Sequence, residues 1–275
     1  MARMRPTLGA LLISLALAAP AAAHDGVVAA APGTPVKLRD CFLTAAFVPR
    51  PASALRSVFD APLDLSMTFY GPDPLVGVWG MSCDRARVGG RRAGSLVLSL
   101  VGVPVGLTSP EALPLANNFA HRLFRMDTNS ARLAAAARRV GLPVSLSRSA
   151  RYTHSPSARI PSTGRLVVPR RYSARVNAAD PDPTNPHDHA NVFEHRATGV
   201  RRSALTMSID DAFDRFCVLP SEDCAAVVKA ARRSPVARLL GGPTAQARAG
   251  FDHDELARVD LVLTAGPARL PPAPR

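Results

Sequence analysis

The sequence predicts a mainly β protein of the α+β class, with an antiparallel, closed or half-open barrel-like sheet and three or four short rim helices. Three observations lead to this fold class. Short apolar runs recur between Gly, Pro and Asx turn signals. Helical spacing is confined to brief segments. Most of the expected strands are joined by turns too short for parallel crossovers. We expect one such domain over residues 36–265.

The N-terminal half supplies the first elements. Residues 36–48 (VKLRDCFLTAAFV) form a strand-like run, and residues 52–59 carry Leu55, Val58 and Phe59 at helical spacing. The other extended segments expected in this half are residues 65–70, 75–83, 95–107 and 117–126.

Residues 95–107 (SLVLSLVGVPVGL) are apolar at nearly every position. Such a run is typical of a strand that is buried on both faces, so we expect it at the centre of the sheet. Pro104 cannot donate to a strand ladder, which places the end of this strand at an edge or a bulge.

Three segments of the C-terminal half have helical character. Residues 131–140 contain good helix formers and stop at Gly141. Residues 224–232 are also expected to be helical, and a short helix should follow with Ser234 as N-cap and Pro235 in its first turn. Strands are expected over residues 144–151, 165–176, 191–195, 200–209, 248–251 and 257–264, with a Pro- and Asx-rich loop at 180–189.

The N-terminus reads as a secretory signal peptide. Arg3 and Arg5 precede an apolar run over residues 8–19, and the small residues 21–23 offer a cleavage site before His24. A membrane anchor is disfavoured because the run is shorter than the roughly 20 residues that a bilayer needs. We expect an extracytoplasmic protein, periplasmic or extracellular, without a transmembrane segment after signal removal. The expected organisation is a signal peptide (1–23), a flexible start (24–35), one domain (36–265) and a disordered tail (266–275).

Four cysteines lie in the mature region, at Cys41, Cys83, Cys217 and Cys224. An even count in an exported chain predicts two disulfides, and three pairings are open from the sequence. We favour Cys41–Cys83, which joins two strand-like runs, and Cys217–Cys224, which closes a small loop. A zinc–thiolate site is the alternative, but the chain has no Cys-x-x-Cys.

The formal net charge is +13, carried almost entirely by arginine because Lys37 and Lys229 are the only lysines. The arginines are scattered or paired and form no long block, and aromatic residues are 5% of the chain. Stacking platforms for bases are therefore not evident. The charge indicates a solubilising basic surface with weak attraction to an anionic envelope polymer, and no specific nucleic-acid partner.

Several segments together resemble the acetoacetate decarboxylase-like barrel superfamily, across most of residues 38–265. They are DCFLTAAFVPRPASAL, the strand leading into MSCD, SLVLSLVGVPVGL, ANNF with MDTNSARLAAAARRVGLPV, HDHANVFEH, and FDHDELARVDLVLT. The resemblance implies a barrel fold. The namesake activity needs a Schiff-base lysine with a lowered pKa. Neither Lys37 nor Lys229 stands in a lysine pair on a barrel strand, so we predict that decarboxylase chemistry is absent.

Without decarboxylase chemistry, the remaining hypothesis is that the barrel encloses a cavity for a small, partly apolar molecule. Tyr70 and Trp79 are candidates for lining such a cavity, although core packing is the commoner fate of such residues. His121 should share a strand face with Phe119 and Leu123, which turns it toward the core or the cavity. A hydrogen-bonded structural histidine is the favoured interpretation of His121.

The stretch NPHDHANVFEH holds His187, His189 and His195. With Asp252 or His253 from the later FDHD stretch, these residues form a candidate ligand or metal cluster, able to bind zinc with an open position. The two stretches lie far apart in sequence, and the chain has no His-Glu-x-x-His. The favoured alternative is a polar turn whose histidines hydrogen-bond backbone groups.

A calcium loop is a further alternative, with oxygen ligands from Asp180, Asp182, Asn185 and Asp188. Its spacing lacks the glycine and closing glutamate of the helix–loop–helix calcium motif. No Gly-x-Ser-x-Gly is present, so no catalytic residue is assigned.

The leading functional hypothesis is an exported, non-enzymatic protein that binds a small, partly apolar molecule or an envelope component. No cofactor is expected under it. The first alternative is a metal-dependent hydrolase or lyase that uses His187, His189 and His195, with zinc or calcium as the metal. The second is a structural or adhesive envelope protein.

Overall fold

The computed structural model describes residues 33–59, 63, 65, 73–105, 118–155, 162–178, 187–196, 202–212, 214–218 and 225–266. Within these ranges, no helix has the length and apolar character that a membrane crossing requires.

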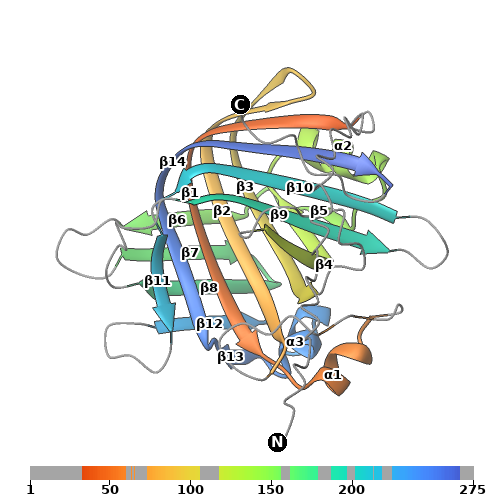
Figure 1. Ribbon diagram of the computed structural model, residues 1–275, viewed down its shortest axis with the longest axis vertical. Helices are drawn as coiled ribbons and strands as arrows, with labels where there is room; N and C mark the ends of the chain where they lie inside the picture. The colour runs from red at the N-terminus through yellow and green to blue at the C-terminus, as the bar shows by residue number, and fades with distance from the viewer. Residues whose placement is uncertain are drawn as a thin grey trace, which may run out of the picture.

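A closed barrel of seven strands forms the body of the protein (Figure 1). In spatial order the strands are β1 (Thr34–Pro49), β2 (Leu75–Val88), β3 (Arg91–Val105), β4 (Asn118–Thr128), β9 (His187–Arg196), β10 (Arg202–Ala212) and β14 (Ala249–Ala265). The long strand β14 pairs with β1 and so closes the sheet on itself. Two short strands join the barrel, β5 (Val144–Leu146) beside β4 and β11 (Asp214–Val218) beside β14. The mainly β, barrel-like class that the sequence predicts is confirmed.

The barrel is not wholly antiparallel, contrary to the expectation from the short turns. Strand β4 pairs in parallel with β9 and also with β5. Between β4 and β9 the chain builds helix α2 (Ala131–Arg139) and three strands of a second sheet. Such a long excursion lets the chain return to the same end of the barrel, which a parallel neighbour requires.

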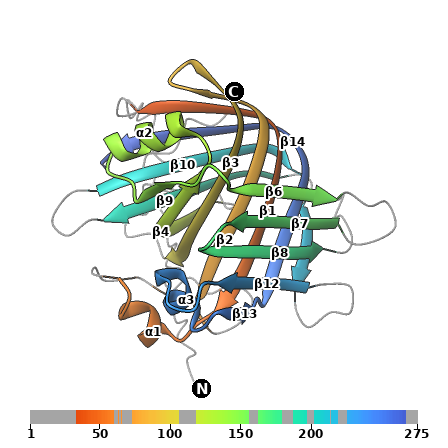
Figure 2. The ribbon, with the colours of Figure 1, turned by 180° about the vertical axis from the view of Figure 1, so that it is seen from behind.

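The second sheet lies across the outside of the barrel (Figure 2). Its spatial order is β13 (Thr244–Gln246), β12 (Ala225–Ala230), β8 (Tyr172–Ala178), β7 (Ser162–Val168) and β6 (Arg151–Ser155). The contact with the barrel is close at Gly80, where an added Cβ would lie 2.8 Å from the Cβ of Leu166. The sequence prediction of one sheet system did not separate this sheet from the barrel.

Strand β3 contributes side chains to two hydrophobic cores. Its residues Leu98 and Leu100 point into the barrel, whereas Val101 and Val103 belong to the core between the barrel and the second sheet. All four side chains are at most 2% exposed. The expectation of a central strand buried on both faces is confirmed.

The structure describes three helices, α1 (Ala52–Arg56), α2 and α3 (Pro235–Leu240). Helix α3 follows its sequence signals, since Ser234 Oγ accepts from the N–H of Ala237 and the left-handed Gly241 ends the helix. The helix expected over residues 224–232 is wrong, because Ala225–Ala230 is strand β12. Pairing with β8 and alternating burial override the helical propensity of this Ala- and Lys-containing segment.

One of the two expected disulfides is confirmed. Cys41 on β1 and Cys83 on β2 are partners in the strand register and are joined by a disulfide. Cys217 lies on β11, but Cys224 is outside the described residues, so the second bridge stays a prediction.

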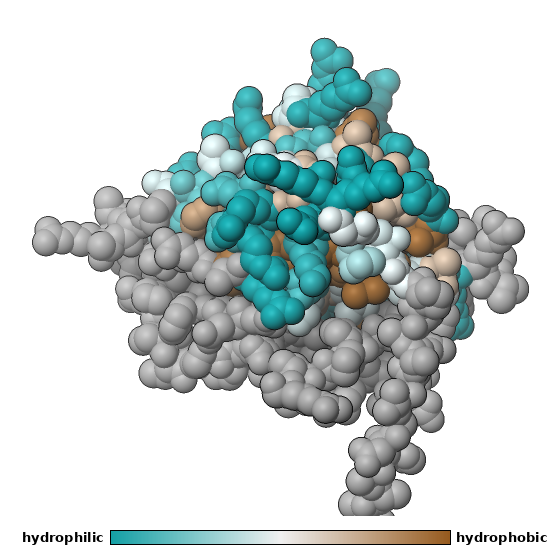
Figure 3. Space-filling view, turned by 90° about the horizontal axis from the view of Figure 1, so that it is seen from above, coloured by the Kyte–Doolittle hydropathy of each residue, from teal (hydrophilic) through white to brown (hydrophobic). Residues whose placement is uncertain are grey.

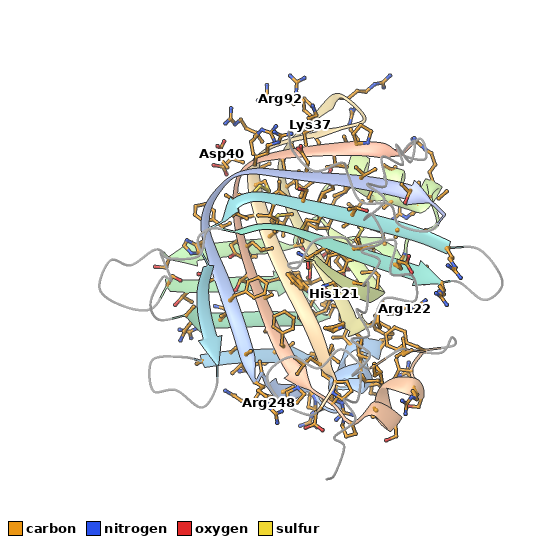
Figure 4. All side chains as sticks on the ribbon, viewed as in Figure 1. Lys37, Asp40, Arg92, His121, Arg122 and Arg248 are labelled. Atoms are coloured by element: carbon orange, nitrogen blue, oxygen red, sulfur yellow. A yellow bond between two sulfur atoms is a disulfide. The ribbon has the colours of Figure 1, made fainter. Side chains whose placement is uncertain are left out.

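Hydrophilic side chains gather at the end of the barrel that holds the β2–β3 hairpin (Figure 3), and labelled charged residues lie there (Figure 4). Lys37, Asp40 and Arg92 lie there, and all three are exposed. Lys37 is the register partner of Arg87, which is in turn the partner of Arg92. This row of like charges on three neighbouring strands is the exposed basic surface that the composition predicts.

Candidate functional site

Four aromatic side chains and one histidine meet inside the barrel; we call them the interior cluster. They are Phe47, Trp79, His121, Phe193 and Phe251, from five different barrel strands. The ring of Trp79 is central, with its centroid 5.2 Å from that of His121, 5.6 Å from Phe193, 5.5 Å from Phe47 and 5.1 Å from Phe251. Each strand contributes a residue from its inward-facing set, which alternation along the strand defines.

The indole of Trp79 packs against a gap left by a glycine. Gly77 is two residues earlier on β2 and faces the same way. A Cβ added at Gly77 would lie 2.7 Å from Nε1 of Trp79 and 3.3 Å from a ring carbon of Phe47. The absence of a side chain at residue 77 therefore gives the indole N–H edge its room. Trp79 itself is 4% exposed.

His121 is held by one hydrogen bond and one stacking contact. Its Nε2 lies 3.1 Å from Oδ1 of Asn191, and its ring stacks on Phe193 with centroids 4.6 Å apart (Figure 4). Burial lowers the pKa of His121 to about 4, and the bond to Asn191 only partly opposes this. The ring is therefore neutral at pH 7. Because the amide oxygen of Asn191 accepts, Nε2 carries the hydrogen and Nδ1 carries the lone pair.

Two polar atoms of the interior cluster lack a hydrogen bond. Nε1 of Trp79 and Nδ1 of His121 are both buried, and neither has a partner among the described residues. Leaving a buried donor or acceptor unpaired costs about 1–3 kcal/mol, and folded proteins rarely do so. The cluster thus presents one N–H donor and one nitrogen acceptor in uncharged aromatic surroundings. The expectation that His121 faces inward is correct, but only one of its two nitrogens is satisfied.

The histidines of the NPHDHANVFEH stretch lie on β9. His187 and His189 pair with Ala212 and Ile209 of β10, but their side chains are outside the described part of the chain. His195 is half-buried, and its Nδ1–H donates to the carbonyl of Leu123 at 3.4 Å. Burial lowers the pKa of His195, and nearby Arg122 lowers it further. His195 fits the alternative of a histidine that hydrogen-bonds the backbone.

Asp252 and His253 belong to β14, with β10 lying between that strand and β9. The backbone of His253 pairs with Leu43 and Asp214, and its side chain is not described. The carboxylate of Asp252 is fully buried and accepts hydrogen bonds from the second sheet. Its donors are Ser162 Oγ at 2.6 Å, His154 Nε2 at 3.0 Å and Tyr152 OH at 3.4 Å.

Alternation explains why Asp252 faces the second sheet, since its neighbour Phe251 faces the barrel interior. Among the side chains that the structure describes, no three His, Cys, Asp or Glu residues are placed to hold a metal ion. The metal hypothesis for His187, His189 and His195, with Asp252 or His253, stays a prediction, because the side chains of His187, His189 and His253 are outside the described part of the chain. Sequence reasoning missed His154 and Ser162, because their strands meet β14 only after the second sheet has folded onto the barrel.

A second buried carboxylate lies between the barrel and the second sheet. Asp127 accepts from Arg125, with Nε at 2.6 Å, from Tyr172 OH at 2.7 Å, and from Nη1 of Arg171. The hydroxyl oxygen of Tyr172 also lies 3.0 Å from Ser99 Oγ. Burial and the carboxylate together raise the pKa of Tyr172 well above its usual value. These hydrogen bonds and ion pairs connect β4 to β8, and their role is to stabilise the packing of the second sheet on the barrel.

The remaining candidates are Tyr70, the possible calcium ligands and the two lysines. Tyr70, Asp180, Asp182 and Asn185 are outside the described residues, as is the side chain of Asp188. Both lysines, Lys37 on β1 and Lys229 on β12, are exposed and lie outside the interior cluster.

The fold is that of the acetoacetate decarboxylase-like barrel, as comparison with solved structures shows. An acetoacetate decarboxylase matches with a TM-score of 0.52 and 15% identity, over 83% of this chain and 86% of that one. The Legionella pneumophila acetoacetate decarboxylase matches with a TM-score of 0.50 and 11% identity, over 84% and 86%. The enduracididine biosynthesis enzyme MppR complexed with pyruvate matches with a TM-score of 0.50 and 10% identity, over 88% and 92%. No protein-family model and no curated protein matches the chain.

Proposed function

We propose that this chain is an exported, non-enzymatic binding protein whose barrel interior holds a small, uncharged, partly apolar molecule. The observation that carries the proposal is the unpaired donor–acceptor pair of Trp79 Nε1 and His121 Nδ1 inside an aromatic cluster. A bound molecule with one carbonyl oxygen and one O–H or N–H group would satisfy both atoms. The aromatic rings would contact its apolar part.

We expect the interior site to distinguish ligands mainly by their charge. Trp79 and His121 are 4% and 2% exposed, and the described side chains in ring contact with them are aromatic. A carboxylate moved into such surroundings loses its hydration and gains no counter-charge, which costs several kcal/mol. A neutral amide or hydroxyketone loses much less. The proposed ligand class is therefore uncharged, unlike the acetoacetate named for the similar enzymes.

A matched pair of small probes tests this proposal. Acetoacetamide carries the carbonyl acceptor and an amide N–H donor, and acetoacetate has the same skeleton with a carboxylate. Trp79 is the only tryptophan of the chain, so its fluorescence reports on the site. We expect acetoacetamide to change that fluorescence in a saturable way, and acetoacetate to bind about tenfold or more weakly. Equal affinity for the two probes would contradict the proposal.

Schiff-base decarboxylation is not proposed for this chain, because both lysines are exposed and lie away from the interior cluster. Borohydride reduces a lysine–ketone Schiff base to a stable secondary amine. We expect that incubation with acetoacetate and borohydride leaves the mass of the protein unchanged. A covalent adduct on Lys37 or Lys229 would contradict the prediction that Schiff-base chemistry is absent.

Export is part of the same proposal and rests on the N-terminal signal features. The Cys41–Cys83 disulfide supports it, because such bonds persist mainly in oxidising compartments. N-terminal sequencing of the protein recovered from its native compartment should begin at His24. A chain that retains residues 1–23 would contradict export by signal cleavage.

A further inference from the structure

The outer face of the parallel pair β4–β9 carries an arginine cluster that the interior site does not use. We define it as Arg122 on β4, Arg196 on β9 and Arg202 on β10. Arg122 lies next to Glu194 in the β4–β9 register, and Arg196 lies opposite Arg202 in the β9–β10 register. Since His121 faces the barrel interior, alternation turns Arg122 to the opposite face.

Arg122 is a buried cation with unpaired donors. Arg122 (labelled in Figure 4) is only 6% exposed, and its Nε and Nη1 atoms have no hydrogen-bond partner among the described residues. Nε of Arg196 is also buried and has no hydrogen-bond partner among the described residues. Two neighbouring strands therefore direct unsatisfied guanidinium donors to one region.

The local charge is unbalanced. Burial lowers the pKa of Arg122, and the charges of Arg196 and Arg202 lower it further, while Glu194 raises it. A guanidinium nevertheless stays protonated in proteins, so the positive charge persists. Within the described residues, three arginines thus face one glutamate. Buried charges are normally paired, because an unpaired one costs several kcal/mol.

We propose that the arginine cluster of Arg122, Arg196 and Arg202 binds a single small oxyanion of the phosphate or carboxylate class. The planar guanidinium presents its N–H groups in a fork that matches two oxygens of such a group. The ligand is one anionic group and not an extended polymer, because Arg122 is almost wholly covered. This site is independent of the proposed ligand inside the barrel.

The test is the thermal unfolding of the mature protein at constant ionic strength, with chloride replaced by inorganic phosphate, sulfate or acetate. We expect at least one of these oxyanions to raise the unfolding midpoint in a saturable way. A larger rise with phosphate or sulfate than with acetate would indicate a tetrahedral ligand, and the reverse would indicate a carboxylate. A protein that responds to none of them more than to chloride would overturn the proposal.

Variants assign the effect to the cluster. Arg122→Met should abolish the oxyanion response, because it removes the guanidinium whose Nε and Nη1 donors have no partner among the described residues. Arg196→Gln should weaken oxyanion binding about tenfold or more. This variant tests the proposal if Arg122→Met does not fold. Arg92→Met removes the same charge from the exposed hairpin end and should leave the response unchanged. An equal loss in Arg92→Met and in the cluster variants would attribute binding to general basic charge, which contradicts the proposal.

Discussion

Replacing Asp127 by Asn is expected to lower the free energy of unfolding by about 3–5 kcal/mol at pH 7, the range for breaking a buried ion pair. The carboxylate is fully buried and accepts from Arg125, Arg171 and Tyr172. An amide cannot accept all of these bonds, and it leaves two guanidinium groups without their counter-charge. Urea unfolding followed by circular dichroism measures the loss.

Asp40→Asn is the matched control for this substitution. Asp40 pairs with Arg85 at 2.6 Å, but the side chains of both residues are largely exposed. Surface ion pairs contribute little to stability, so this control should unfold at the same urea concentration as the original protein. A loss in Asp127→Asn no larger than that in Asp40→Asn would show that the network does not fasten the second sheet to the barrel.

A second large effect is expected from the protonation of His121. Its pKa is about 4 in the folded protein, against 6.5 for an ordinary histidine. Between these pH values the unfolded chain binds more protons than the folded one, so stability falls as the pH falls from about 6.5 toward 4. At about 1.4 kcal/mol per pKa unit, the shift corresponds to a loss of about 3 kcal/mol.

His121→Phe isolates this contribution. Phe fills the stacked position on Phe193 without a titrating group, so the variant should lose about 3 kcal/mol less than the original protein between pH 7 and pH 4. The readout is the difference between the two pH profiles of the free energy of unfolding, which cancels the titration of the acidic residues. Parallel profiles would mean that His121 does not titrate with a lowered pKa.

Local sequence signals predicted the parts of the fold that depend on neighbouring residues. Ser234, Pro235 and Gly241 delimit α3 as expected, because caps and turns act within a few residues. The apolar run that forms β3 could be recognised as buried on both faces. The helix expected over residues 224–232 was wrong, since its strand conformation depends on β8, which is distant in sequence.

The interior site could be predicted only in part, for the same reason. Trp79 and His121 were identified as inward-facing candidates, but their meeting depends on closure of the barrel. The bond between His121 and Asn191 joins residues 70 positions apart, and that between His154 and Asp252 joins residues 98 apart. The parallel pairing of β4 with β9 brings Asn191 to His121. Short turns between neighbouring strands give no sign of this pairing, because β4 and β9 are far apart in sequence.

The central claim is that a small neutral molecule binds beside Trp79 Nε1 inside the barrel, and acetoacetamide titration of two glycine variants tests it most directly. Gly77→Ala places a methyl group 2.7 Å from Nε1, whereas Gly80→Ala on the same strand crowds Leu166 outside the barrel. We predict that Gly77→Ala weakens acetoacetamide binding about tenfold or more, while Gly80→Ala keeps the original affinity despite a loss of stability. Unchanged affinity in Gly77→Ala, or an equal loss in both variants, would contradict the claim.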